Sequence, residues 1–309
     1  MPQKHRRHEE RTTRVQGGAR SESGQVAAPS RVLVEVSGLS HRGLVRENNE
    51  DHFLVARLDR TMQTLVTNLP PGAVPDRSED TVYGMLVADG MGGHAAGELA
   101  SRTAVATLVN LVLRTPDIIM RLDPHYTEEA LRRFERRFQE IAEVLREQAK
   151  TDPRLAGMGT TMTLACSAGS DLIVAHVGDS RAYLLREGRL QRLTSDQTMA
   201  QFLADTGMIS QDEIENHPMR HMLTGALSTR DGPTDVDLTA QRLRSGDQVL
   251  LCTDGLFDLV PDASISALLQ QPGSPAEVCQ RLVTAALEGG GRDNVTVVLG
   301  RYRIGTEGS

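Results

Sequence analysis

The chain has 309 residues, enough for one large domain or two small ones with a sizeable buried core. Its 34 Lys and Arg against 41 Asp and Glu give a net charge of −7. That balance argues against nucleic acid as the main partner, because phosphate contacts require basic residues gathered on one face. Three widely spaced cysteines, no apolar run of about 18 residues and no signal peptide favour a soluble, cytoplasmic protein without disulfides or a membrane span.

The two ends of the chain differ in composition from its middle. Residues 1–30 hold basic side chains among Glu, Gly, Ser and Gln without an apolar period, which predicts a disordered basic tail. Residues 31–304 are expected to form the folded domain, and residues 305–309 a short C-terminal tail.

The folded part is expected to begin with two strands, over residues 32–36 and 53–58, separated by a polar loop at 41–51. Residues 67–80 are rich in proline and acidic side chains and are predicted to form a surface excursion between two strands.

Residues 83–101 are the stretch around which the chain is organised. Residues 83–88 are short and mostly apolar, which predicts a buried strand that ends at Asp89. Glycines after Asp89 allow a turn, and a helix is expected from Ala95. The candidates for its buried side are Leu99, Val105, Leu108, Val109 and Val112. A carboxylate at the tip of a buried strand, beside bare glycine backbone, can bind a metal ion or a phosphate group.

A second helix is predicted over residues 128–148, where apolar residues recur at helical spacing. Short strands are expected between residues 157 and 194, with turns near 169–170, 178–179 and 187–188. Two helices followed by strands indicate a helical layer on a sheet.

The last third is expected to continue with a helix that opens at a capping box over residues 194–197 and runs through Leu203. Residues 210–229 are polar and predicted to be an irregular segment beside a site. Two strands, at 236–243 and 248–252, a helix from a cap at Ser274 to about Leu287, and a final strand at 295–299 are expected to complete the fold.

Three acidic residues share one context, an apolar strand or its edge next to glycine: Asp89, Asp254 and Asp293. Carboxylates that converge at buried strand ends repel one another unless cations lie between them. Oxygen ligands alone favour hard ions such as Mg²⁺ or Mn²⁺. One bridging carboxylate can hold two ions about 3.5–4 Å apart, an arrangement that activates water for displacement at phosphorus.

Six motifs also occur in the order typical of a known family. They read RENNED, VADGMGGHAAGELAS, GMGTT, AHVGDSRAYL, CTDGLFDLV and GGRDNVTVV. In these motifs the chain resembles the bacterial metal-dependent PPM (type 2C) serine/threonine protein phosphatases, from Val32 to Arg303. The resemblance implies an α+β fold, a four-layer α-β-β-α sandwich in which two central, mostly antiparallel sheets are flanked by helices.

The resemblance assigns metal-binding roles by position. Asp89 is expected to bridge two Mn²⁺ or Mg²⁺ ions, and Gly90 to add its backbone carbonyl. Asp254 and Asp293 are expected to complete the first ion, while Asp51 serves the second through water. Asp179, with Asp254, is expected to take a weaker third ion. Glu50 and Asn294 are expected to support these ligands from outside.

Substrate contacts are assigned in the same way. Arg46 is expected to bind the substrate phosphate, because its planar fork suits paired oxygens. Arg46, Asp89 and Asp254 are therefore the expected catalytic residues. Met91 stands where many eukaryotic members carry a histidine proposed to protonate the leaving group, so that role is unassigned. His94 is a candidate substrate contact, with a helix-cap histidine as the structural alternative.

The implied function is hydrolysis of phosphoserine and phosphothreonine in proteins by direct attack of a metal-bridging hydroxide, opposing a bacterial serine/threonine kinase. The expected partners are that kinase and its substrates, and the expected state is a monomer. The alternative from another class is a catalytically weak PPM-like module for binding or regulation, a pseudophosphatase. Retention of the metal carboxylates and of Arg46 favours the enzyme.

Two other readings of the motifs are unfavourable. Residues 90–95 match a dinucleotide-binding glycine pattern, but Asp89 would face the pyrophosphate as a like charge, and no further βαβ unit follows. His217 and His221 have the spacing of a zinc pair on a helix, but Pro218 and the missing catalytic glutamate argue against it. We expect both histidines in a flap beside the site.

Overall fold

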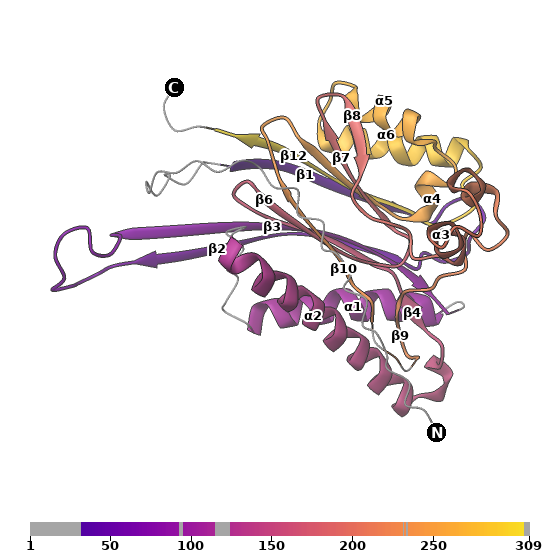
Figure 1. Ribbon diagram of the computed structural model, residues 1–309, viewed down its shortest axis with the longest axis horizontal. Coiled ribbons are helices and arrows are strands. Elements are labelled where there is room, and N and C mark those ends of the chain that lie inside the picture. The colour runs from indigo at the N-terminus through magenta and orange to yellow at the C-terminus, as the bar shows by residue number, and fades with distance from the viewer. Residues whose placement is uncertain (1–31, 93–94, 115–123, 231, 233, 306–309) are drawn as a thin grey trace.

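A computed structural model describes residues 32–92, 95–114, 124–230, 232 and 234–305 (Figure 1). The predicted tail at residues 1–30 and His94 lie outside the described residues. Strand pairings among the described residues are antiparallel and build two sheets.

The first sheet has five strands. Their order is β1 (Val32–His41), β12 (Val295–Ile304), β11 (Gln248–Cys252), β7 (Arg181–Arg186) and β8 (Arg189–Arg192). The bounds of β11 are those predicted, whereas β1 and β12 are each about twice as long as expected because they pair along ten residues.

The second sheet has seven strands. Its main path is β10 (Asp237–Arg242), β6 (Asp171–Val177), β5 (Met162–Ala168), β3 (Arg77–Met91), β4 (Gly159–Thr160) and β9 (Leu227–Ser228), with β2 (Asp51–Gln63) paired to β3. The prediction that Asp89 ends its strand is wrong. The strand continues for two residues because Gly90 and Met91 pair with Thr160 and Gly159.

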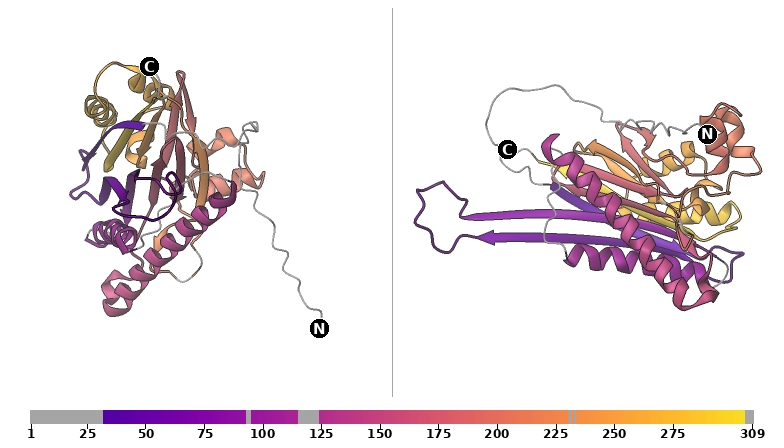
Figure 2. Two further views of the ribbon diagram at one scale, coloured as in Figure 1. Left: turned by 90° about the vertical axis from the view of Figure 1, so that its left-hand side faces the viewer. Right: turned by 60° about the horizontal axis from the view of Figure 1, so that its bottom comes forward.

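Helices cover the outer face of each sheet (Figures 1 and 2). The seven-stranded sheet is covered by α1 (Ala95–Arg114) and α2 (Pro124–Thr151), and the five-stranded sheet by α5 (Asp262–Gln270) and α6 (Pro275–Glu288). The α-β-β-α sandwich implied by the resemblance is therefore confirmed. No described helix is both long and apolar enough to cross a bilayer.

Strand residues alternate between the layers, as a period of two requires. In β3, Leu86 and Ala88 pack toward α1 and α2, while Met85 and Val87 pack between the sheets. In β11, Leu250 and Cys252 pack toward α6, and Val249 and Leu251 join the layer between the sheets. Continuous apolar runs such as LLC therefore mark strands that are covered on both faces.

The predicted helices of the outer layers are present. α2 buries Phe134, Phe138, Ile141 and Leu145, the apolar series on which its prediction rested. α6 begins after Ser274, whose hydroxyl accepts a hydrogen bond from the amide of Glu277 in the predicted capping box. Of the five residues proposed for the buried side of α1, Val109 alone is outside the core cluster.

The predicted capping box at residues 194–197 is wrong. The helix there is α3 (Met199–Asp205), and its N-cap is Thr198, whose hydroxyl accepts from the amide of Gln201. Asp196 binds Arg181 instead, and the Gln197 side chain accepts from the amide of Gly178. Tertiary partners therefore take the polar groups that the local pattern assigned to a helix start.

The helical turn α4 (Asp254–Phe257) and α5 were not predicted. α4 is a single turn, and neither helix has a side-chain hydrogen bond at its N-cap. Two 3₁₀ turns, η1 (Pro153–Leu155) and η2 (Gln211–Asn216), complete the described elements, and η2 lies in the segment predicted to be irregular.

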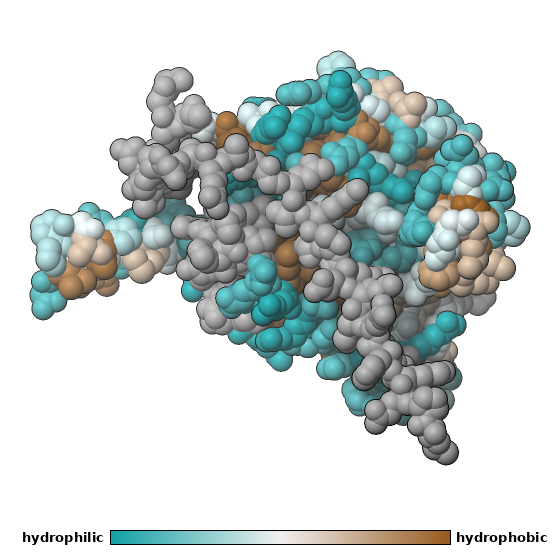
Figure 3. Space-filling model, viewed as in Figure 1, coloured by the Kyte–Doolittle hydropathy of each residue, from teal (hydrophilic) through white to brown (hydrophobic). Residues whose placement is uncertain are grey.

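The hairpin of β2 and β3 extends beyond the body of the molecule (Figures 1 and 2). Its strands pair from Asp51 with Asp89 to Gln63 with Arg77, so the predicted surface excursion is shorter and begins earlier, at residues 64–76. Apolar residues gather at its tip, where Leu65 and Val66 are exposed (Figure 3).

Candidate metal and phosphate site

A cleft of about 1310 Å³ opens at one end of the sandwich, where loops from both sheets meet. Among the predicted site residues, those that line it are Arg46, Glu50, Asp89, Gly90, Asp179, Asp254, Asp293 and Asn294. They come from the loop before β2, the end of β3, the β6–β7 turn, the start of α4 and the loop before β12. The structure thus brings together residues that are distant in sequence, such as Arg46 and Asp293, which are 247 positions apart.

Asp51 and Asp89 oppose each other across β2 and β3. Like charges at directly opposite positions of an antiparallel pair destabilise it. Asp51 is buried, and one of its carboxylate oxygens accepts a hydrogen bond from the Thr253 hydroxyl at 2.8 Å. Burial raises the pKa of Asp51 to about 7, and burial, with Asp51 next, raises the pKa of Asp89 well above its usual value.

Asp254 and Asp179 bring two further carboxylates near this pair; both line the cleft, as Asp89 does, whereas Asp51 does not. Asp254 is the first residue of α4, and burial, with the charges of Asp179 and Asp293, raises its pKa well above the usual value. Asp179 lies on the β6–β7 turn, where burial, with Asp196 next, raises its pKa to about 7. Four carboxyl groups therefore share one region in which ionisation is unfavourable.

Two oxygen atoms of this group have no hydrogen-bond partner. Among the buried side-chain oxygens of the described residues, Asp51 Oδ1 and Asp254 Oδ1 are the unsatisfied ones. A buried polar atom without a partner costs about 1–3 kcal/mol, and more if it is charged. Divalent cations would offset both the charge repulsion and the missing contacts, and a site made of oxygen ligands suits Mg²⁺ or Mn²⁺.

Asn294 and Glu50 hold the loop that leads into β2. The Asn294 side chain accepts from the Glu50 amide at 2.8 Å and donates to the carbonyls of Arg42 and Asn48. The Glu50 carbonyl in turn accepts from Gly90 N and from the Ser101 hydroxyl at 2.6 Å. These bonds connect the loop of Arg46 to the strand end of Asp89.

Gly90 lies where two backbone segments come very close. A Cβ at this position would lie 2.1 Å from the Gly97 carbonyl oxygen and 2.8 Å from that of Glu50. Gly90→Ala is therefore expected to destabilise the fold by at least about 2 kcal/mol, because backbone must move to relieve the overlap. Gly84→Ala is a matched control on the same strand, since nothing lies within 4 Å of its Cβ position. Urea unfolding of both variants measures the difference, and equal midpoints would contradict the expectation.

The Arg46 side chain is exposed, and its guanidinium forms an ion pair with Asp293. Its Nη2 lies 2.6 Å from Asp293 Oδ2, and this hydrogen bond is the largest contribution to the raised pKa of Arg46. The guanidinium expected to bind phosphate therefore lies directly beside one of the expected metal ligands.

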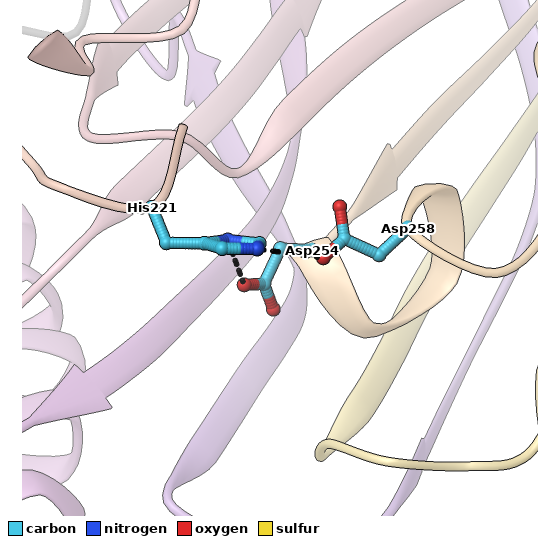
Figure 4. A group of neighbouring side chains, drawn as sticks. All are labelled: His221, Asp254 and Asp258. Atoms are coloured by element: carbon cyan, nitrogen blue, oxygen red, sulfur yellow. Dashed lines mark ion pairs between the residues drawn. The ribbon is translucent and has the colours of Figure 1, made fainter. Parts of the chain in front are cut away.

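His221 lies beside Asp254 and Asp258, as Figure 4 shows. Its Nε2 is 3.4 Å from Asp258 Oδ2, and its Nδ1 is 4.0 Å from Asp254 Oδ2. Arg220 also binds Asp258, at 2.9 and 3.3 Å. One ligand atom from each of His221, Asp254 and Asp258 lies within 4.8 Å of the others.

Sequence reasoning missed Asp258, although its spacing of four from Asp254 could have placed both on one side of a helical turn. His217 and His221 do not lie on one helix. His217 caps the end of η2, and His221 lies in the turn that follows.

Comparisons with known proteins show which family and which relatives the chain is similar to. Residues 74–287 match the family model described as protein phosphatase 2C. The chain is 42% identical over 271 residues to the serine/threonine protein phosphatase PstP of Mycobacterium tuberculosis. That match covers 87% of this chain and 45% of the relative, so the chain spans about half the length of this relative.

Two further comparisons cover nearly the whole of the related chain. The chain is 33% identical over 258 residues to the serine/threonine phosphatase stp of Listeria welshimeri, covering 84% of this chain and 92% of that protein. A crystal structure of the catalytic domain of a serine/threonine phosphatase PstP, in complex with two manganese ions, is similar with a TM-score of 0.68. It is 35% identical in sequence, and the match covers 88% of this chain and 100% of that one.

Proposed function

We propose that this chain, which belongs to the protein phosphatase 2C family, hydrolyses phosphoserine and phosphothreonine in proteins and requires divalent metal ions. The observation that carries the proposal is the convergence of Asp51, Asp89 and Asp254 with two unsatisfied buried carboxylate oxygens. The names of the relatives, and the two manganese ions of a related catalytic domain, support the same activity.

Two Mn²⁺ or Mg²⁺ ions would be held by Asp89, which would serve both, by Asp254, Asp293 and the Gly90 carbonyl, and by Asp51 through water. Asp179 and Asp254 would hold a weaker third ion. When bound, such ions would lower the pKa of a coordinated water toward neutrality and so would supply hydroxide at pH 7. The Thr253 hydroxyl holds Asp51 in place by donating to it, and also accepts from the Thr296 amide.

Arg46 would bind two oxygens of the substrate phosphate through its planar guanidinium. Its contact with Asp293 keeps it at the mouth of the acidic centre, where its charge offsets that of the carboxylates. A phosphate on the acidic centre would therefore meet a guanidinium that is already in place.

Arg46→Ala is expected to lower kcat/KM on a phosphothreonine peptide roughly 10- to 100-fold, the loss that follows from removing hydrogen bonds to a charged group. The kcat/KM of Arg46→Lys should lie between those of the wild type and of Arg46→Ala, because lysine keeps the charge but cannot form the paired bonds. Arg42→Ala is the matched control in the same loop, since the Arg42 side chain does not line the cleft. Equal losses in Arg42→Ala and Arg46→Ala would remove Arg46 from phosphate binding.

We also propose that the protein is a cytoplasmic monomer that opposes a serine/threonine kinase by acting on its phosphorylated substrates. The three free cysteines support a reducing compartment.

The activity itself is tested by phosphate release from phosphothreonine and phosphotyrosine peptides, with Mn²⁺ and with excess chelator. The proposal predicts release from the phosphothreonine peptide, loss of that release in chelator, and much slower release from phosphotyrosine. Folded protein that releases no phosphate with Mn²⁺ or Mg²⁺ would contradict it and favour a pseudophosphatase.

A further inference from the structure

We infer that Arg181 is a positioning residue for the metal site, and that it acts by holding the ring of Phe257 on the helical turn that begins with Asp254. The Arg181 Cζ atom lies 3.6 Å from the centroid of the Phe257 ring. Phe257 is the last residue of α4 and Asp254 the first, so the contact holds the far end of the turn that presents this carboxylate to the cleft.

α4 needs such a contact because it cannot hold its own orientation. It is a single turn, and helices this short are not stable alone. Its N-cap residue, Thr253, makes no side-chain cap bond, since its hydroxyl is engaged with Asp51 and with the Thr296 amide. The direction of Asp254 therefore depends on tertiary contacts of the residues that follow it.

All three nitrogen atoms of the Arg181 guanidinium have side-chain partners. Nε and Nη2 donate to the Asp196 carboxylate at 3.0 and 2.6 Å, and Nη1 lies 3.2 Å from the Tyr183 hydroxyl. Tyr183 donates in turn to Asp262 at the start of α5. The Arg181 and Asp196 side chains are 17% and 8% exposed, so water competes little for these bonds. The stacked guanidinium is thus a fixed surface against which Phe257 rests.

The residues next to Asp179 connect the two sheets. Asp179 lies on the turn between β6, in the seven-stranded sheet, and β7, in the five-stranded sheet. Ser180, which follows it, lies 2.8 Å from the Thr161 hydroxyl, and that hydroxyl accepts from the Asp89 amide at 3.1 Å.

The adjacent residues Ser180 and Arg181 therefore each contact a residue that positions one of the carboxylates. Through Thr161, Ser180 reaches Asp89, and through Phe257, Arg181 reaches Asp254. The turn that carries Asp179 consequently sets the position of Asp254, which follows β11 of the five-stranded sheet, relative to Asp89 in β3 of the seven-stranded sheet. The expected effect of Arg181 on cation affinity rests on the proposed function, in which these carboxylates bind metal ions.

The test is Mn²⁺ binding measured by titration calorimetry, beside the Mn²⁺ concentration that gives half-maximal phosphate release. Arg181→Lys keeps the charge but loses the flat, forked guanidinium, and should raise the Kd for Mn²⁺ roughly 10-fold or more, as loss of a group that orients metal ligands does. Activity should recover as Mn²⁺ is raised, and the KM for the peptide should change little, because Arg181 does not line the cleft.

The matched control is Arg186→Lys. Arg186 lies on the same strand, is similarly buried at 19% exposure, and binds Asp247 through Nε and Nη2 at 2.9 and 2.6 Å. It therefore reports the cost to stability of losing a forked bond on β7, without any contact to α4. Its Kd for Mn²⁺ should match that of the wild type.

Two Phe257 variants keep the test decisive if Arg181→Lys fails to fold. Phe257→Leu removes the ring and should raise the Kd for Mn²⁺ as Arg181→Lys does, whereas Phe257→Tyr keeps it and should stay within about twofold of wild type. Kd values for Arg181→Lys and Phe257→Leu equal to those of Arg186→Lys would overturn the inference. Wild-type protein that binds Mn²⁺ without releasing phosphate would overturn the proposed function alone, and protein that binds no Mn²⁺ would overturn both.

Discussion

Asp89→Asn is expected to abolish phosphate release from a phosphothreonine peptide while leaving the metal-free protein at least as stable as the wild type. The activity should fall more than about a hundredfold, the upper end of the loss seen when groups that merely orient metal ligands are removed. Asparagine has nearly the same shape as aspartate but carries no charge, so it cannot hold two cations.

The expected stability of metal-free Asp89→Asn follows from the burial of residue 89. Asp89 faces Asp51 across the strand pair, and its pKa is raised well above the usual value by burial first and by Asp51 next. Without metal, its ionised form is therefore unfavourable in the folded chain, and removing the charge relieves that cost. An ordinary core substitution would do the opposite and lower the midpoint of unfolding.

The measurement pairs an activity assay with thermal unfolding in chelator and in Mn²⁺. Asp80→Asn serves as the control, because Asp80 is an exposed carboxylate on the same strand. We expect Mn²⁺ to raise the unfolding temperature of the wild type and of Asp80→Asn, and to have little effect on Asp89→Asn. A metal-free Asp89→Asn protein clearly less stable than the wild type would show that Asp89 supports the fold rather than cation binding.

The metal-free protein is also expected to lose stability as the pH rises toward neutrality. Burial raises the pKa of both Asp51 and Asp179 from 3.8 to about 7. Between these pH values the folded chain keeps protons that the unfolded chain has released, so the free energy of unfolding falls as the pH rises. The combined loss is on the order of several kcal/mol, since one pKa unit corresponds to about 1.36 kcal/mol.

Mn²⁺ should cancel this loss, because a cation takes the place of the protons. The stabilisation that Mn²⁺ provides is therefore expected to be larger near pH 8 than near pH 5. Urea unfolding in chelator and in Mn²⁺ at both pH values measures it. Metal-free stability that stays constant or increases from about pH 5 to pH 7 would contradict the raised pKa of these two carboxyl groups.

Local pattern was sufficient for the parts of the site that follow single strands. Asp89 and Asp254 were recognised because each follows a buried apolar run and precedes glycine, and both meet in the cleft. The bounds of β11 and the start of α6 were also predictable, since the first is a continuous apolar run and the second a capping box with proline.

The other features of the site depend on contacts between residues that are distant in sequence. The register of β2 against β3 sets Asp51 opposite Asp89, and nothing in either segment alone determines it. Arg181 was visible in the sequence as part of GDSR, but its ring contact with Phe257 requires both sheets to be in place. The local pattern places the helix cap four residues before Thr198, because it assigns Asp196 to a helix start although Asp196 forms an ion pair with Arg181.

The proposed activity requires that the carboxylates at the cleft bind the cations that drive phosphate release. The most direct measurement follows both quantities in one preparation: Mn²⁺ is added stepwise to metal-free protein while bound metal and phosphate release from a phosphothreonine peptide are recorded. We predict no release at zero metal and a rise that follows the filling of two sites. Release that is already present in metal-free protein, or full occupancy without release, would contradict the claim.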